Sequence, residues 1–115
     1  MDDCLFCAIV AGDVPAEVVE RTERTLTFRD IGPQAPVHLL AVTTAHHADL
    51  GALSDANPAL LAELAAAAVR AGRDAGLDGG YRVVTNIGDD AGQSVHHVHL
   101  HVLGGAALGL FGTPG

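Results

Sequence analysis

Apolar and polar residues alternate in several short stretches of this chain, and such alternation is typical of a half-buried β-strand. The clearest stretch is 97–102, where three histidines alternate with two valines and a leucine. Because successive side chains of a strand point to opposite faces, we expect the imidazoles on one face and the aliphatic side chains on the other. Related patterns predict strands at 17–21, 25–30, 38–42 and 81–86, of which the first two form a hairpin.

Two other stretches have the pattern of helices. The apolar run 4–11 stops at Gly12, which predicts a short helix. A longer helix is expected from residue 59 to about residue 75, where an apolar stripe follows helical spacing. Asn57 suits its N-cap and Pro58 its first position. No repeat or linker divides the chain, so we expect a single domain spanning residues 1–115.

Charge and composition disfavour some classes of function. The chain has 115 residues and a formal net charge of −8, and it contains six arginines but no lysine. A DNA- or RNA-binding role is disfavoured, because there is no basic run to follow a phosphate backbone. Polar residues interrupt every apolar segment before it could span a membrane, and the first residues are acidic where a signal peptide would be basic. We expect a cytoplasmic protein with no membrane or nucleic-acid partner.

The row of histidines is the first candidate for chemistry. Each buried imidazole needs partners for both ring nitrogens, so three on one face suggest metal ligation or nucleophilic and acid–base catalysis. Cys4 and Cys7 have the C-x-x-C spacing, which favours a metal over a structural disulfide, although two thiols are only half of a zinc site. Asp30, at the end of a predicted strand, either begins a turn or accepts hydrogen bonds from vicinal sugar hydroxyls.

Residues 97–103 follow the pattern His-φ-His-φ-His-φ-φ, in which φ is apolar. With Gly92-Gln93-Ser94 before this pattern and Gly104-Gly105 after it, the chain resembles the histidine triad superfamily and its Hint branch of nucleotide-binding proteins. Weaker matches extend the resemblance over nearly the whole chain. It implies an α+β fold with a five-stranded antiparallel sheet, one long and one short helix, and a homodimer whose sheet is continuous. The strands and helices predicted above agree with this fold.

The resemblance also implies hydrolysis or transfer of nucleoside monophosphate groups. His99 resembles the nucleophile, which attacks the α-phosphorus and forms a nucleotidyl-imidazole intermediate that water resolves. His101 resembles a ligand of phosphate oxygens, and His38 the histidine that orients the nucleophile from a neighbouring strand. The other implied positions are Ser94 and Gln93 beside the phosphate and the leaving amine, Asn86 and Gly92 beside the phosphate, Val95 as a main-chain donor, Asp30 at the ribose, and Phe28 and Ile31 at the base.

A zinc site is implied as well. Members of the family with an N-terminal C-x-x-C motif bind zinc through both thiols, a histidine eight residues after the strand histidine, and the first triad histidine. These positions are Cys4, Cys7, His46 and His97 in this chain, and His47 could replace His46 by a shift of one residue. Four protein ligands leave no open position for water, so zinc would be structural and would fix the start of the triad.

Three functions stay open at this point. The first is a purine nucleoside phosphoramidase that acts on nucleoside 5′-phosphoramidates or aminoacyl adenylates and releases AMP. The second is a dinucleoside polyphosphate hydrolase, although the Gln-Ser pair before the triad and the Gly-Gly pair after it favour the first. The third is a non-enzymatic nucleotide- or zinc-binding protein, against which the intact His99 argues. Redox chemistry at the two cysteines is excluded if zinc holds both thiols.

The chain departs from the family pattern at three places, one of which is Thr43-Thr44-Ala45, where the proline and lysine common in relatives are missing. His96 stands where many relatives have an aromatic residue, and it should face away from the triad. The tail after Gly105 is longer than in close relatives, although Phe111 and Pro114-Gly115 look related to theirs. Because that tail tunes leaving-group preference in the relatives, the specificity for the leaving group does not follow from the resemblance.

Overall fold

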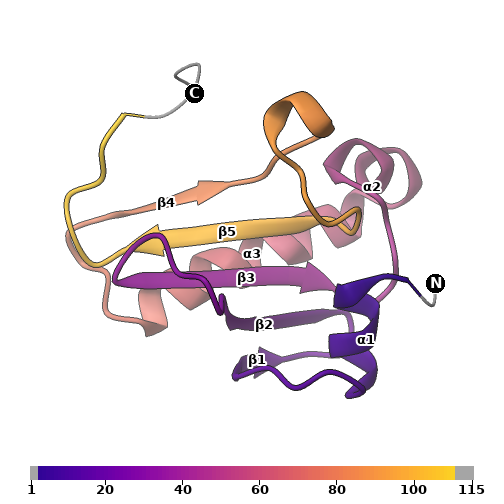
Figure 1. The fold of residues 1–115 in the computed structure, drawn as a ribbon, viewed down its shortest axis with the longest axis horizontal. Coiled ribbons are helices and arrows are strands. Elements are labelled where there is room, and N and C mark those ends of the chain that lie inside the picture. The colour runs from indigo at the N-terminus through magenta and orange to yellow at the C-terminus, as the bar shows by residue number, and fades with distance from the viewer. Residues whose placement is uncertain (1–2, 111–115) are drawn as a thin grey trace.

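Residues 3–110, which the computed structural model describes, fold around a five-stranded antiparallel sheet (Figure 1). Its strands are β1 (Val18–Arg21), β2 (Thr25–Arg29), β3 (Val37–Thr43), β4 (Tyr81–Val84) and β5 (His99–Gly104). The order in the sheet is β1-β2-β3-β5-β4, so β1 and β4 are the two edges. The histidine strand β5 therefore lies inside the sheet, between β3 and β4.

Helices cover both faces of the sheet (Figure 1). The long helix α3 (Pro58–Asp74) runs across one face, and α1 (Leu5–Ala11) lies against the other, beside the ends of β2 and β3. The short helix α2 (Leu50–Ala56) packs against α3, and a single 3₁₀ turn, η1 (Asp89–Ala91), precedes the histidine segment. No helix among these residues is long and apolar enough to cross a membrane.

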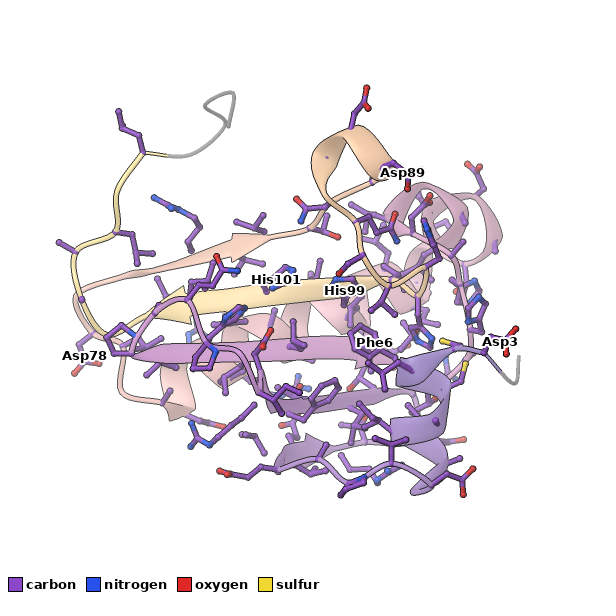
Figure 2. All side chains as sticks on the ribbon, in the orientation of Figure 1. Asp3, Phe6, Asp78, Asp89, His99 and His101 are labelled. Carbon is purple, nitrogen blue, oxygen red and sulfur yellow. The ribbon has the colours of Figure 1, made fainter. Side chains whose placement is uncertain are left out.

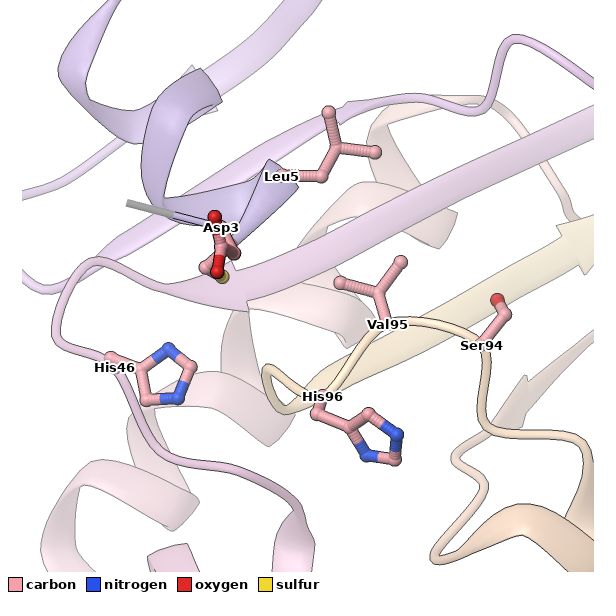
Figure 3. A pocket seen from close by; sticks show the side chains of 7 residues that line it. Asp3, Leu5, His46, Ser94, Val95 and His96 are labelled. Atoms are coloured by element: carbon pink, nitrogen blue, oxygen red, sulfur yellow. The ribbon is translucent and has the colours of Figure 1, made fainter. Parts of the chain in front are cut away.

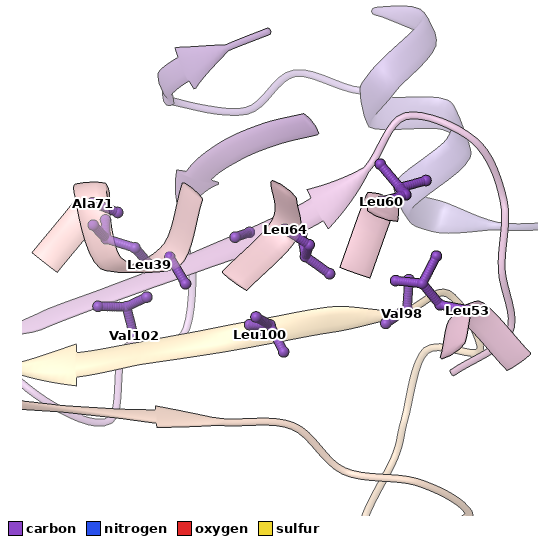
Figure 4. Close-up of a cluster of buried hydrophobic side chains, with 10 residues drawn as sticks. Leu39, Leu53, Leu60, Leu64, Ala71, Val98, Leu100 and Val102 are labelled. Atoms are coloured by element: carbon purple, nitrogen blue, oxygen red, sulfur yellow. The ribbon is translucent and has the colours of Figure 1, made fainter. Parts of the chain in front are cut away.

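The pleat of the central strands divides the core into two parts. On one face, Leu39 of β3 lies opposite Val102 of β5, and both pack under α3 (Figure 4). The even-numbered residues of β3 point to the other face, where Leu40 and Val42 pack with Phe6 of α1. The histidine side chains of β5 belong to this second face, because they alternate with the aliphatic residues of the α3 face.

The strands, the short N-terminal helix and the long helix predicted from the sequence are confirmed. As expected, Asn57 caps α3, and its Oδ1 accepts a hydrogen bond from the Leu60 N–H at 3.1 Å. The prediction of one short helix was wrong, because α2 is a second one. Its sequence contains Gly51, Ser54 and Asp55, which have low helix propensity, and it depends on packing and on an Asp49 cap.

The structure moves the limits of the first three predicted strands by one residue and those of the last two by two residues. β4 ends at Val84 rather than at residue 86, and β5 begins at His99 rather than at His97. A bend at residues 95–97 carries His97 out of the strand ladder, which alternation of residue types alone does not reveal. The tail residues Phe111 and Pro114-Gly115, singled out in the sequence, lie outside the described residues.

Candidate functional site

β3 and β5 bring three histidines to the sheet face that α1 covers. In the antiparallel ladder His101 pairs with Leu40 and His99 pairs with Val42, and directly paired residues lie on the same face. His38 is two residues before Leu40 and therefore shares this face. Figure 2 shows His99 and His101 beside each other on β5, and their ring centroids are 5.1 Å apart. The ring centroids of His38 and His101 are also 5.1 Å apart. The three imidazoles form one compact group.

His99 is held in one defined orientation. Its side chain is buried, and its Nδ1–H donates to the main-chain carbonyl of His97 at 2.7 Å. Phe6 packs edge-on against the ring, with centroids 5.0 Å apart. Since a carbonyl oxygen can only accept, Nδ1 carries the proton and Nε2 keeps its lone pair. Burial lowers the pKa of His99, so the ring is neutral near pH 7 and can act as a nucleophile.

His38 is hydrogen-bonded to His101 and not to His99. Its Nε2 lies 2.9 Å from His101 Nδ1 and 3.5 Å from Asp30 Oδ2, and its Nδ1 accepts from the Gln34 main-chain N–H at 3.1 Å. The family resemblance implied that His38 orients the nucleophile from a neighbouring strand, and in the structure the ring of His38 contacts His101 instead of His99. The strand register explains the difference, because it makes His101 the diagonal neighbour of His38 and leaves His99 one more pair of residues away.

A cavity of about 230 Å³ lies between α1, the end of β2 and the triad strand. His99 and His101 form one end of it, and Asp30 borders it with a carboxylate whose Oδ1 accepts from the Gly32 N–H. An apolar wall beside a carboxylate and two imidazoles suits a ligand that has a flat ring, hydroxyls and an anionic group. The apolar side chains of the wall include Leu5, Phe6, Ile9, Phe28, Ile31, Leu40 and Val95.

Five of the predicted nucleotide-binding residues other than the histidines line this cavity: Phe28, Asp30, Ile31, Ser94 and Val95. Leu5, Phe6 and Ile9 of α1, whose apolar run predicted only a short helix, also line it. Helical spacing of apolar residues indicates a covered face, but it does not say whether protein or ligand covers that face.

Gln93 does not line the cavity, although it was expected beside the phosphate. Its side chain is buried, and main-chain groups use its amide. Oε1 accepts from the Gly88 N–H at 2.9 Å, and Nε2 donates to the carbonyls of Ala48 at 2.7 Å and Val95 at 3.1 Å. The Gln93 side chain therefore braces the loop before the triad in this structure.

Gly92 and Asn86 also lie outside the cavity lining. Gly92 ends the turn η1 with φ of +84°, a left-handed conformation that favours glycine, so its role in this structure is to turn the chain. Asn86 is half-buried, two residues beyond the end of β4. Ser94 is the exposed residue of this loop that borders the cavity.

A second group of reactive side chains gathers at the start of α1. The ligand atoms of Cys4, Cys7, His46 and His97 all lie within 4.8 Å of one another, and this cluster could hold a metal ion. Cys4 Sγ is 3.3 Å and Cys7 Sγ 3.5 Å from His97 Nδ1, and Cys7 Sγ is 3.4 Å from His46 Nδ1. Tetrahedral zinc, with bonds of about 2.3 Å to sulfur and 2.0–2.1 Å to nitrogen, sets sulfur and nitrogen about 3.5 Å apart. The donors and their spacing therefore fit zinc.

Hydrogen bonds and burial around this cluster set the protonation and orientation of its donor atoms. His97 is fully buried, and its Nε2–H donates to the Thr43 carbonyl at 2.7 Å, which leaves Nδ1 to face the thiols. Burial lowers the pKa of His97 and so favours the neutral, ligating ring. Cys4 caps α1, and its Sγ accepts from the Cys7 N–H at 3.3 Å. In the metal-free chain, burial raises the pKa of the Cys7 thiol, and hydrogen bonding to Cys4 adds to this effect.

Main-chain groups hold both clusters in place, and sequence reasoning missed them. They are the N–H of Gln34, the carbonyl of Thr43 and the carbonyl of His47, which accepts from the Val98 N–H at 2.7 Å. Nearly every residue type offers these groups, so no sequence signal could have identified them. The two neighbouring histidines therefore differ in role. His47 contributes a main-chain carbonyl, whereas His46 contributes its side chain to the cluster that could hold a metal.

A larger cavity of about 560 Å³ adjoins the first and shares Leu5, Ser94 and Val95 with it (Figure 3). His96 lines this second cavity, away from the triad as the sequence predicted. Its side chain is exposed, and its Nε2 lies 3.8 Å from Asp89 Oδ1. None of the triad histidines lines this cavity.

The sequence of this chain is similar to those of known proteins over most of its length. The sequence pattern of the HIT domain matches residues 11–108. This chain belongs to the HIT family. An uncharacterized HIT-like protein of Synechococcus elongatus is 38% identical over 107 residues, which cover 93% of this chain and 94% of that protein. The family resemblance inferred from the triad motif is therefore confirmed.

Solved HIT structures share the whole fold. A HIT family hydrolase from Clostridium thermocellum has a TM-score of 0.92 and 35% identity, with 98% of this chain and 99% of that chain covered. A histidine triad nucleotide-binding protein from Candida albicans has a TM-score of 0.80 and 28% identity, with 98% and 86% covered. The α+β fold with its five-stranded antiparallel sheet is thus that of solved HIT proteins.

Proposed function

We propose that this HIT protein is a nucleotide-binding hydrolase that cleaves purine nucleoside 5′-phosphoramidates, or aminoacyl adenylates, and releases AMP. One observation carries the proposal: His99 borders the cavity as a neutral ring whose Nδ1–H is fixed by the His97 carbonyl. A binding module would not need a nucleophilic nitrogen held in this way. The likeness to a HIT family hydrolase from C. thermocellum and to a histidine triad nucleotide-binding protein from C. albicans supports both halves of the proposal.

The residues of the cavity suit the parts of such a substrate. The apolar wall, including Phe28 and Ile31, takes the purine. Asp30 accepts hydrogen bonds from the ribose hydroxyls, and its carboxylate is already held by the Gly32 N–H. His101, on the same strand face as His99, contacts the phosphoryl oxygens. Ser94, at the rim, lies beside the leaving amine.

The reaction has two steps. His99 Nε2 attacks the α-phosphorus, a phosphorus–imidazole bond forms, and the phosphorus–nitrogen bond to the amine breaks. The amine nitrogen takes up a proton from water and leaves. A second water then attacks the phosphorus, the phosphorus–imidazole bond breaks, the water proton goes to solvent, and AMP leaves with His99 restored.

Zinc in the Cys4, Cys7, His46 and His97 cluster has a structural role in this proposal. Four protein ligands complete a tetrahedral site and leave no position for substrate or water. When bound, zinc supplies a fixed anchor between α1 and the segment before β5. The chain's own residues carry out the chemistry.

We extend the proposal to a homodimer. Among the described residues β4 pairs with β5 on one side only, so its outer edge can pair with β4 of a second copy and make the sheet continuous. Val83, on this edge strand, is 42% exposed, which a partner would reduce. Analytical ultracentrifugation tests the dimer, and a monomer at micromolar concentration would contradict it.

The decisive experiment measures AMP release from adenosine 5′-phosphoramidate and, in parallel, from diadenosine tetraphosphate. We expect turnover of the phosphoramidate by the zinc-loaded native protein and a loss of at least about 10³-fold in His99→Ala. His96→Ala is the matched control, because His96 lies on the same segment but outside the cavity. Preference for the tetraphosphate would indicate a polyphosphate hydrolase. Binding of AMP without turnover of either compound would indicate a non-enzymatic nucleotide-binding protein.

A further inference from the structure

We infer that the main-chain N–H of Gln34 fixes the proton positions on both His38 and His101, so that His101 presents a neutral Nε2–H to the cavity. His38 is then a positioning residue that acts through His101. The inference concerns the site of the proposed function, and its catalytic meaning rests on that function. The proton positions themselves do not depend on it.

The first step concerns His38. The Gln34 N–H can only donate, and it reaches His38 Nδ1 at 3.1 Å. Nδ1 must therefore accept, and in the neutral ring the proton sits on Nε2. The His38 side chain is only 4% exposed, so water cannot easily satisfy the opposite arrangement. A backbone group thus selects the tautomer, and it does so without depending on the side chain of Gln34.

The second step concerns His101, whose tautomer follows from that of His38. The Nε2–H of His38 points at His101 Nδ1, 2.9 Å away, so Nδ1 of His101 accepts and its proton sits on Nε2. A second proton on His101 would place an N–H against an N–H at this distance. The groups that face His101 are His99 of the same strand, His38 of β3 and Asp30 after β2. Burial, followed by His99 and His38, lowers the pKa of His101 to about 4, in the same direction as this argument.

The consequence is that two neighbouring rings present opposite chemistry. His99 offers a lone pair at Nε2, because its Nδ1–H is bound to the His97 carbonyl. His101 offers an N–H at Nε2, because its Nδ1 is bound to His38. One ring can attack phosphorus while the other donates to a phosphoryl oxygen. A neutral donor stabilises the developing charge without releasing a proton that would quench the nucleophile.

A competing explanation is a metal site, since ligand atoms of Asp30, His38 and His101 also lie within 4.8 Å of one another. A metal would take the lone pair of His38 Nε2, and the proton would have to move to Nδ1. There it would face the Gln34 N–H, donor against donor. The geometry therefore favours a hydrogen-bonded chain over metal ligation at these three residues.

Nitrogen-15 NMR of the histidine rings in the zinc-loaded protein tests the inference without any turnover. At pH 7 we expect both His38 and His101 to be protonated at Nε2 only, and His101 to stay neutral down to about pH 5. A proton on Nδ1 of His101 at pH 7, or double protonation above pH 6, would overturn it. If these states hold but no phosphoramidate is cleaved, the proposed function fails and the proton arrangement stands.

Two pairs of variants identify the cause. Gln34→Pro removes the N–H, whereas Gln34→Ala keeps it, so only the proline variant should move the His101 proton from Nε2 to Nδ1. If Gln34→Pro does not fold, His38→Gln and His38→Glu test the second step, that the group at position 38 sets the proton position on His101. The amide of glutamine still donates to His101 Nδ1, but a carboxylate accepts and should leave His101 doubly protonated at pH 7, with the acid limb of kcat/KM shifted upward. Identical His101 states within either pair would refute the inference.

Discussion

His97 joins the candidate metal cluster to His99, the proposed nucleophile: its ring Nδ1 lies 3.3 Å from Cys4 Sγ, and its main-chain carbonyl accepts the Nδ1–H of His99 at 2.7 Å. The ring is held on its other side by the Thr43 carbonyl. A displacement of the His97 ring therefore moves the group that orients His99. This connection links the position of the N-terminal segment to the geometry of the histidines on β5.

Replacing a metal ligand should consequently affect both metal content and activity. We expect His46→Ala to lose bound zinc, to lower Tm by about 10 °C or more, and to reduce turnover, because the cluster loses a donor and His97 loses its anchor. Zinc content by atomic emission, thermal unfolding and AMP release measure the three effects.

His47→Ala is the matched control for this prediction. The side chain of His47 is outside the cluster, and its contribution to Val98 comes from a main-chain carbonyl that alanine keeps. It should retain zinc and nearly the native Tm. Loss of zinc from the His47 variant and retention in the His46 variant would show that the cluster is assigned to the wrong histidine.

Asp30 should strengthen the binding of substrates that carry ribose hydroxyls. We expect Asp30→Asn to raise KM for adenosine 5′-phosphoramidate by about 10- to 100-fold, because charge-assisted hydrogen bonds of about 1.5–3 kcal/mol are lost. The 2′,3′-dideoxy analogue should bind native protein and variant alike. A double-mutant cycle from the four KM values measures the coupling between Asp30 and the ribose hydroxyls. An equal rise in KM with both substrates would mean that Asp30 contacts only His38 and not the ribose.

The sequence predicted this site unevenly, and the reasons are physical. Alternation and capping identified the strands and α3, since each leaves a periodic pattern of residue types. The triad spacing placed His99 and His101 on one face, because a strand has period two. It could not show that His97 leaves the ladder, nor that His38 contacts His101, because a bend and a register depend on distant partners. Nor could it show that main-chain groups use the Gln93 amide, because those groups leave no pattern in the sequence.

The lowered pKa of His101 should make the protein less stable in acid. The unfolded chain takes up a proton at His101 near pH 6.5, but the folded chain resists this until about pH 4. The unfolded state therefore binds more protons in this window, and the free energy of unfolding falls as pH decreases, by at most about 1.4 kcal/mol per pH unit. Above pH 6.5 this contribution is fully present.

Urea unfolding of the native protein and His101→Asn at pH 6.5 and pH 5.0 isolates this effect. The asparagine variant lacks the titrating ring, whereas proton uptake at His97 and His99 is common to both proteins. We expect the native protein to lose more stability between the two pH values than the variant does. Equal losses would mean that His101 takes up its proton equally well in the folded protein.

Valine substitutions at two threonines of β2 should change stability in opposite directions. Both are buried and share one sheet face, but only Thr25 has a partner for its hydroxyl, at 2.8 Å from Thr22 Oγ1. The Oγ1 of Thr27 is buried and has no hydrogen-bond partner among the described residues. Thr27→Val removes an unsatisfied hydroxyl without changing shape, so it should raise the free energy of unfolding by about 1 kcal/mol.

Thr25→Val should lower that free energy by a similar amount, because it removes the hydrogen bond that joins the start of β2 to Thr22. Urea unfolding at neutral pH compares both variants with the native protein, with the slope against urea checked for constancy. Opposite signs are the expected result. If both substitutions destabilise, the Thr27 hydroxyl is hydrogen-bonded to a buried water, and this face of the sheet is not dry.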